Sequence, residues 1–178
     1  MRLFIAVNFD DDIKDRIMNT SLRLRKEAVR GSFSARENLH ITVVFIGEVR
    51  QDRVDTIKEI VDSVSVSPFD VEISGLGAFK RNEGDIYWLG IRNYEPLGSI
   101  SGYLSRRLRK AGFDIEDRPF KPHLTLGRRV IMAKDFDREK FSRETDKVSC
   151  PVSRISLMLS ERKDGKLIYT EIYGKELE

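Results

Sequence analysis

The chain contains only two histidines, and each begins the same short pattern, His-x-Thr, at residues 40–42 and 123–125. Both patterns lie in apolar runs that are typical of β-strands, at residues 39–46 and 123–130. Side chains alternate along a strand, so the histidine and the threonine of each pattern point to the same face. If the two strands face each other, they place an acid, a base and two hydroxyl donors around one small anion.

The remaining residues predict the elements that would hold these two strands. Apolar residues recur at helical spacing in three segments, and a glycine or a proline follows each segment. We expect helices at residues 10–29, 51–66 and 96–111. Further strands are expected at residues 3–9, 69–79, 86–91, 152–160 and 167–173, with tight turns at 81–84 and 163–166. Residues 135–147 are polar and predict a short helix or an ordered loop.

The two histidine strands recur 83 positions apart, and each follows a helical segment, which indicates an internal duplication. We therefore expect one domain at residues 1–178, made of two intertwined, pseudo-symmetric lobes. The expected fold class is α+β, with mainly antiparallel sheets facing a central cleft and helices outside. A pseudo-two-fold axis between the lobes would bring the two His-x-Thr patterns to opposite sides of one site.

Composition narrows the class of protein. The 178 residues are 40% hydrophobic and 34% charged, and no apolar run reaches the length that crosses a membrane. A single cysteine, Cys150, excludes an internal disulfide and fits a reducing cytoplasm. One cysteine and two histidines are too few for a typical structural zinc site, so we expect chemistry without a metal or another cofactor. The net charge of +3 is compatible with RNA as a partner, and the mixed-charge surface favours a monomer.

The two patterns and their surroundings resemble the 2H phosphoesterase superfamily, which is named for two His-x-Thr motifs. Within it, the chain is most similar to the RNA 2′,3′-cyclic phosphodiesterases, historically called 2′-5′ RNA ligases. The resemblance covers nearly the whole length and rests on residues 2–6, 38–49, 87–90 and 120–128, together with Ser160, Gly165, Tyr169 and Thr170. It implies the two-lobed fold expected above and hydrolysis of a terminal 2′,3′-cyclic phosphate to a 2′-phosphate.

The resemblance also implies roles for the four motif residues. His40 matches the family histidine that donates a proton to the leaving 3′ oxygen, and His123 matches the one that activates water as a base. Thr42 and Thr125 match hydroxyls that bind the phosphate. Histidine has an unperturbed pKa of about 6.5, so near neutral pH one imidazole can be protonated while its partner is neutral. The residues alone leave open which histidine is the acid, because the duplication makes them look alike.

Arg128 lies five residues after His123, where relatives carry a phosphate-contacting arginine. A guanidinium at this position would clamp a phosphate through two hydrogen bonds. Strict alternation, however, places Arg128 on the face opposite His123. It reaches the cleft only if the strand ends or bulges near Gly127, and Arg129 is the alternative on the histidine face.

Two aromatic residues near the motifs receive different assignments. Trp88 is a candidate for stacking on the terminal base of an RNA, and the alternative is a half-buried strand residue that packs under a helix. Phe45 lies opposite the His40 face by strict alternation, so we assign it to the core.

Three functions fit these residues. The first is a metal-independent hydrolase acting on RNA that ends in a 2′,3′-cyclic phosphate, with tRNA fragments as candidate substrates. The second is a ligase that uses the same site to join such an end to a 5′-hydroxyl in a 2′-5′ bond, as between paired tRNA-like halves. The third is an RNA-end-binding module without turnover. The presence of two complete His-x-Thr motifs argues against the third.

Overall fold

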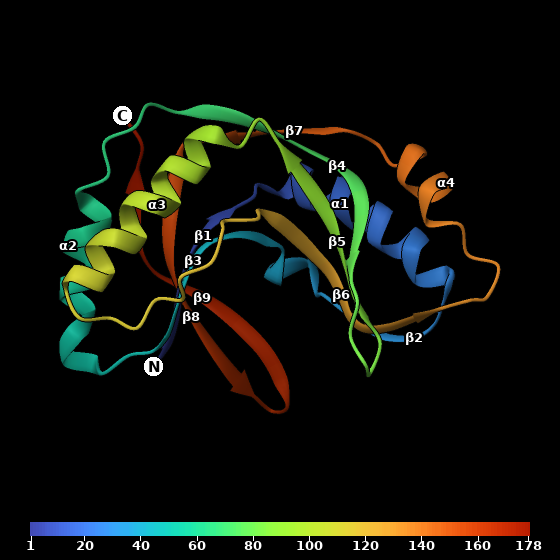
Figure 1. Cartoon of the computed structure of the whole chain (residues 1–178), viewed down its shortest axis with the longest axis horizontal. Coiled ribbons are helices and arrows are strands. Elements are labelled where there is room, and N and C mark those ends of the chain that lie inside the picture. Colours follow the sequence, from blue (N-terminus) through green and yellow to red (C-terminus); the bar gives the residue numbers. More distant parts are fainter.

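Two antiparallel sheets form the frame of the molecule (Figure 1). The computed structural model describes all 178 residues. The first sheet, called sheet A, has the strand order β3 (His40–Glu48), β1 (Arg2–Asn8), β8 (Arg154–Lys163) and β9 (Lys166–Glu176). The second, sheet B, has the order β2 (Ala28–Phe33), β6 (His123–Met132), β5 (Asp85–Arg92), β4 (Phe69–Phe79) and β7 (Val148–Val152).

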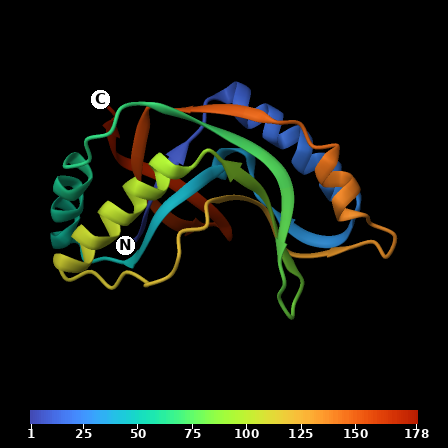
Figure 2. The same cartoon turned by 45° about the horizontal axis from the view of Figure 1, so that its top comes forward.

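Each sheet is covered by two helices on the face away from the other sheet. Helices α2 (Val54–Asp62) and α3 (Glu95–Lys110) pack on sheet A, and α1 (Asp11–Lys26) and α4 (Arg138–Arg143) pack on sheet B. Figure 2 shows the two helix pairs at opposite ends of the molecule. Short 3₁₀ turns at Arg36–Asn38 (η1) and Gln51–Arg53 (η2) complete the elements. No helix is long and apolar enough to cross a membrane.

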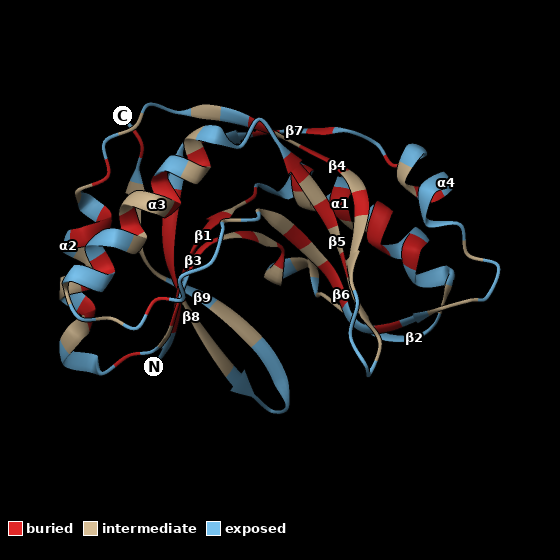
Figure 3. Cartoon of the chain, in the orientation of Figure 1, coloured by how far each residue is buried: buried red, intermediate tan, exposed pale blue.

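The two halves of the fold exchange helices. Helix α1 follows β1 of sheet A but packs on sheet B, and α3 follows β5 of sheet B but packs on sheet A. Helix α3 does so because its buried residues recur at spacings of three and four and form one apolar stripe: Leu97, Ile100, Leu104 and Leu108. Figure 3 shows buried positions alternating with more exposed ones along the central strands, whereas the far end of the β8–β9 hairpin is exposed.

The expected fold class is confirmed: the protein is α+β, its strand pairs are antiparallel, and two related sheets face each other with helices outside. Strand β4 has the bounds that the sequence predicted, Phe69–Phe79, and the turn between β8 and β9 falls at the expected Asp164-Gly165 pair.

Two strands were not predicted, and both are explained by pairing across the fold. The first expected helix ends at Lys26 rather than near Val29, because Ala28–Phe33 pairs with β6 as β2. The strand expected at residues 152–160 is two strands, because the chain leaves sheet B after Val152 and enters sheet A at Arg154. The expected helix at residues 51–66 is shorter than predicted and begins as the 3₁₀ turn η2. Local periodicity contains no signal for such changes of sheet.

Candidate active site

His40, the first residue of β3, is held on three sides. Its Nδ1 lies 2.8 Å from the carbonyl oxygen of Asn38, and its Nε2 lies 2.9 Å from the hydroxyl of Thr42. Because a carbonyl can only accept, Nδ1 carries a proton, which leaves Nε2 as the nitrogen that can gain or lose one. The ring packs against Phe4 and Tyr169, with centroid distances of 4.9 and 5.1 Å.

His123, the first residue of β6, repeats this arrangement. Its Nδ1 lies 2.8 Å from the carbonyl oxygen of Lys121, again two residues before the histidine. Its ring packs edge-on against Phe79 at 5.1 Å and against Trp88 at 6.0 Å. Its Nε2 makes no hydrogen bond within the chain, unlike that of His40. Each histidine is thus fixed by one carbonyl and two aromatic rings, with Nε2 as the reactive nitrogen.

The structure brings the two histidines to one site. Strands β3 and β6 lie side by side between the sheets (Figure 1). Burial lowers the pKa of His40, and the charges of Arg128 and His123 lower it further, against the opposing hydrogen bond to Asn38. Burial also lowers the pKa of His123, and the cations Arg128 and Arg118 act in the same direction. Arg128 therefore lies close enough to influence both imidazoles.

A β-bulge follows the first motif. Ala6 pairs with Thr42, but the next residue of β1, Ile5, pairs with Val44, so Val43 is an extra residue in β3. Both Val43 and Val44 are buried, and the strand resumes its alternation with the opposite phase. The ladder does not satisfy the carbonyl of the extra residue, and the buried hydroxyl of Ser101 on α3 donates to it at 2.8 Å.

An equivalent bulge follows the second motif. Trp88 pairs with Thr125, and the preceding residue Tyr87 pairs with Gly127, so Leu126 is extra in β6. Leu126 and Gly127 are both buried, and the carbonyl of Leu126 accepts from the backbone N–H of Ser34 at 2.8 Å. The two bulges occupy the same position relative to the two His-x-Thr motifs. The internal duplication therefore extends beyond the motif residues to the backbone geometry after them.

The second bulge decides the position of Arg128. By reversing the alternation, it turns Arg128 toward the face that carries His123, which is the condition that the sequence required. The alternative, Arg129, has a left-handed backbone with φ 53° and lines a separate polar hollow of about 640 Å³ with Arg30, Gly31, Ser32, Asn82 and Glu83. Parity alone had placed Arg129 on the histidine face, and the extra residue in β6 is the reason for the difference.

The first bulge shows that the assignment of Phe45 to the core is wrong. Phe45 pairs with Phe4, whose ring packs on His40, so the two phenylalanines share the cleft face of sheet A. The Phe45 side chain is 42% exposed. Phe45 and Arg128 each follow their histidine by five residues and occupy equivalent places after the two bulges.

Trp88 lies on the cleft face of sheet B, beside Thr125. Its ring covers Gly77, where an added Cβ would lie 2.2 Å from the indole, and its other neighbours are Phe79 and His123. The indole nitrogen is buried and has no hydrogen-bond partner. These contacts make Trp88 a wall behind His123.

Asn38 is a positioning residue that sequence reasoning did not identify. Its backbone carbonyl accepts from His40, while its side-chain amide donates to the carbonyl of Leu167 at 2.8 Å and its Oδ1 accepts from the N–H of Tyr169 at 3.3 Å. One residue thus ties the first histidine to the β8–β9 hairpin, which carries the aromatic ring beside it. The only signal in the sequence was its place two residues before the motif.

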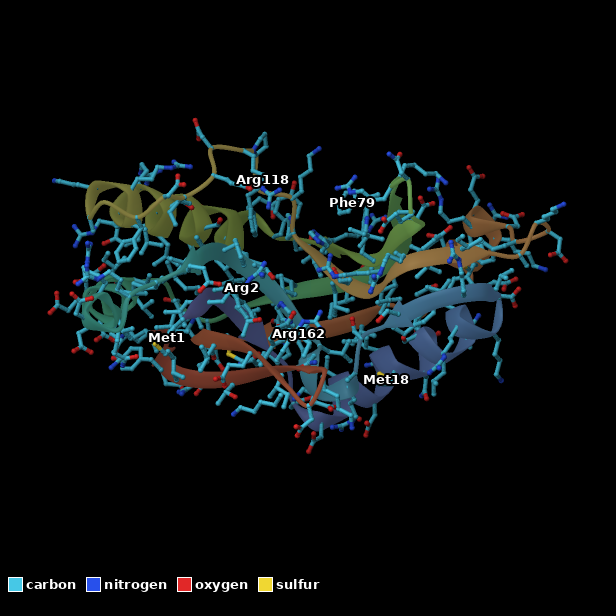
Figure 4. The ribbon with its side chains drawn as sticks, turned by 90° about the horizontal axis from the view of Figure 1, so that it is seen from below. Met1, Arg2, Met18, Phe79, Arg118 and Arg162 are labelled. Carbon is cyan, nitrogen blue, oxygen red and sulfur yellow. The ribbon has the colours of Figure 1, made fainter.

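Cations surround the open side of the site. Arg118 and Phe79 lie along the upper edge of Figure 4, and Arg2 and Arg162 lie below them. Arg118 pairs with Glu116, whereas Arg2, Arg128 and Arg162 form no ion pair. No three His, Cys, Asp or Glu side chains are grouped so that they could hold a metal ion. The arrangement is suited to an anion held between two imidazoles.

Ser101→Ala is expected to weaken the bulge in β3. It leaves the buried carbonyl of Val43 without a donor, which costs about 1–3 kcal/mol in the free energy of unfolding. Urea denaturation measures the loss. The matched control is Ser99→Ala on the same helix, because Ser99 is exposed and bonds only to Glu95 of its own helix. Equal stabilities for the two variants would contradict the assigned role of Ser101.

Asn38→Ala is expected to loosen the β8–β9 hairpin where it meets His40. The amide proton of Tyr169 loses its acceptor, so its hydrogen exchange should become faster, as NMR can measure. Asn38→Asp is the control, because it keeps the acceptor for Tyr169 but loses the donor to Leu167. Unchanged protection of Tyr169 in Asn38→Ala would show that this side chain does not hold the hairpin.

Comparison with known proteins agrees with this geometry. Residues 10–164 match the model of the 2′-5′ RNA ligase superfamily. An RNA 2′,3′-cyclic phosphodiesterase of Archaeoglobus fulgidus is 37% identical over 131 residues, which is 72% of each chain. One of Thermotoga maritima is 27% identical and covers 100% of this chain and 96% of its own.

Solved structures give the same result for the fold. The crystal structure of E. coli LigT complexed with 3′-AMP superposes with a TM-score of 0.83 at 26% identity, covering 99% of this chain and 97% of that one. The superposition spans both sheets and so includes both histidine motifs. With the family match over residues 10–164, it shows that the chain belongs to the 2′-5′ RNA ligase superfamily.

Proposed function

We propose that this chain is an RNA 2′,3′-cyclic phosphodiesterase that forms a 2′-phosphate by metal-independent acid–base catalysis. The family and the names of its relatives support the activity. The observation that carries the mechanism is the repeated imidazole geometry. His40 and His123 each donate from Nδ1 to a backbone carbonyl, which leaves both Nε2 atoms available for proton transfer.

In the proposed reaction, water attacks phosphorus on the side opposite the 3′ oxygen. His123 Nε2 accepts the proton of the water as the new P–O bond forms, and protonated His40 donates from Nε2 to the 3′ oxygen as the P–O3′ bond breaks. The products are a 2′-phosphate and a 3′-hydroxyl. The free Nε2 of His123 suits the base, whereas that of His40 already contacts a hydroxyl, Thr42.

Charge on the phosphoryl oxygens is proposed to be stabilised by Thr42, Thr125 and Arg128. Hydroxyl donors and a guanidinium that are already in place need no reorganisation when charge develops. The influence of Arg128 on both imidazoles supports its place at the phosphate. Arg128 and the two hydroxyls would supply the stabilisation that a metal gives other phosphodiesterases, which is why the proposal includes activity without one.

One chain would suffice for this reaction. Both motifs belong to residues 1–178, so we propose that a monomer holds a complete site in one domain of two intertwined lobes. Trp88 remains a candidate surface for a nucleobase, and its contacts favour support of His123 instead.

A second candidate is ligation. The family model carries the name of a 2′-5′ RNA ligase, and the same site could use a ribose 5′-hydroxyl in place of water. Incubation of paired tRNA-like halves, one ending in the cyclic phosphate and one in a 5′-hydroxyl, distinguishes the two. The hydrolase is favoured if 2′-phosphate accumulates, and the ligase if a 2′-5′ linked product dominates.

His40→Asn and His123→Asn are each expected to lower turnover of an RNA 2′,3′-cyclic phosphate by about 10²–10⁴-fold, because each removes one proton transfer. The assay maps the terminal phosphate of the product in EDTA, and circular dichroism checks that the variants fold. Loss of wild-type activity in EDTA would disprove metal independence. Binding without turnover by the wild type would support the non-catalytic module.

The pH dependence should move when Arg128 is removed. Both histidine pKa values lie below the usual 6.5, so kcat/KM should fall as pH rises through the lowered pKa of the acid. A cation disfavours the imidazolium, so Arg128→Gln should raise both pKa values and shift this limb to higher pH. Histidine NMR titration and the pH–rate profile measure the shift.

Arg162→Gln is the control for that experiment. Arg162 lies on the exposed β8–β9 hairpin and is not among the groups that shift either histidine. A downward shift in Arg128→Gln, or equal shifts in the two variants, would contradict the position assigned to Arg128.

A further inference from the structure

The two motifs are nearly symmetric, but the residues after their bulges are not. Phe45 follows the bulge in sheet A, and Arg128 follows the bulge in sheet B. A site with two equivalent His-Thr pairs cannot by itself distinguish the two sides of a phosphate. The residues that differ between the lobes must therefore orient the substrate, and these two occupy equivalent positions.

Phe45 presents an aromatic ring to the cleft. It pairs with Phe4, whose ring contacts His40, so it shares the face of the first histidine. Its side chain is 42% exposed, although a large apolar side chain in a sheet is usually covered. Three residues separate it from Thr42, about 10 Å at roughly 3.3 Å per residue, which leaves room for a ribose between a phosphate at Thr42 and the ring.

Arg2 completes the surface around Phe45. It precedes Phe4 by two residues on β1, and its guanidinium carbon lies 5.1 Å from the centroid of the Phe45 ring. It forms no ion pair, and its charge opposes the burial-raised pKa of Tyr169, the ring beside His40. Figure 4 places Arg2 between Arg118 and Arg162. An exposed ring with an unpaired guanidinium is a surface that single-stranded nucleic acids use for base stacking.

We propose that Phe45 and Arg2 form a platform for the nucleobase of the nucleotide that carries the cyclic phosphate. This inference rests on the proposed function and adds the orientation of the substrate. The base on Phe45 places the ribose and its 3′ oxygen on the His40 side, and the opposite face of the phosphate toward His123. The platform thereby assigns the acid to His40 by position, which the duplicated sequence could not do.

The test is a cycle between the platform and the base. Two short RNAs end in a 2′,3′-cyclic phosphate, one with a normal terminal nucleotide and one with an abasic terminal nucleotide. Phe45→Ala is expected to lower kcat/KM on the first RNA by about tenfold, mainly through KM, because stacking contributes about 1–3 kcal/mol per base. On the abasic RNA the same substitution should have a much smaller effect. Phe45→Tyr should restore discrimination, since it keeps the ring.

Leu22→Ala on α1 is the matched control, because it truncates another exposed apolar side chain and should change neither rate. If the wild type hydrolyses both RNAs and Phe45→Ala loses equally on both, the platform is disproved while the proposed function stands. If the wild type hydrolyses neither RNA, the proposed function fails, and equilibrium binding of the same RNAs decides the platform. Preference for the normal end that depends on Phe45 supports it, and equal binding overturns it.

Discussion

One extra residue in each histidine strand sets the geometry of the site. Without the bulges, strict alternation would direct Phe45 and Arg128 into the core and leave only the His-Thr pairs in the cleft. The bulges bring three positions of each strand to one face. Each extra carbonyl is satisfied from outside the ladder, by Ser101 on α3 or by the backbone of Ser34. A bulge with an unsatisfied buried carbonyl would cost stability, so these contacts are part of the site.

The exchange of helices joins the two lobes around this site. Because α3 follows sheet B but packs on sheet A, the donor to the bulge in β3 comes from the segment that leads to the second motif. A change in either lobe is therefore felt at the bulge of the other sheet. The link gives a physical reason why two small sheets hold one cleft between them.

The electrostatics follow from the same arrangement. Both imidazoles are surrounded by aromatic rings and face the cation Arg128, so their pKa values are lowered. An anionic substrate supplies the opposite charge and favours the imidazolium again. Proton transfer would then be coupled to binding, because the doubly cationic state is unfavourable until the phosphate is present. The nearby arginines without ion pairs contribute to the attraction of that anion.

The sequence by itself determined the motif residues, the antiparallel α+β fold and the duplication, because side-chain alternation and apolar spacing are local properties. It also showed that Arg128 needs a bulge to reach the cleft. Only the tertiary structure decided that the bulge exists, that Phe45 faces the cleft, and that Asn38 and Ser101 hold the strands. These depend on pairing and hydrogen bonds between segments far apart in the chain, and a bulge changes the phase of a strand without changing its composition.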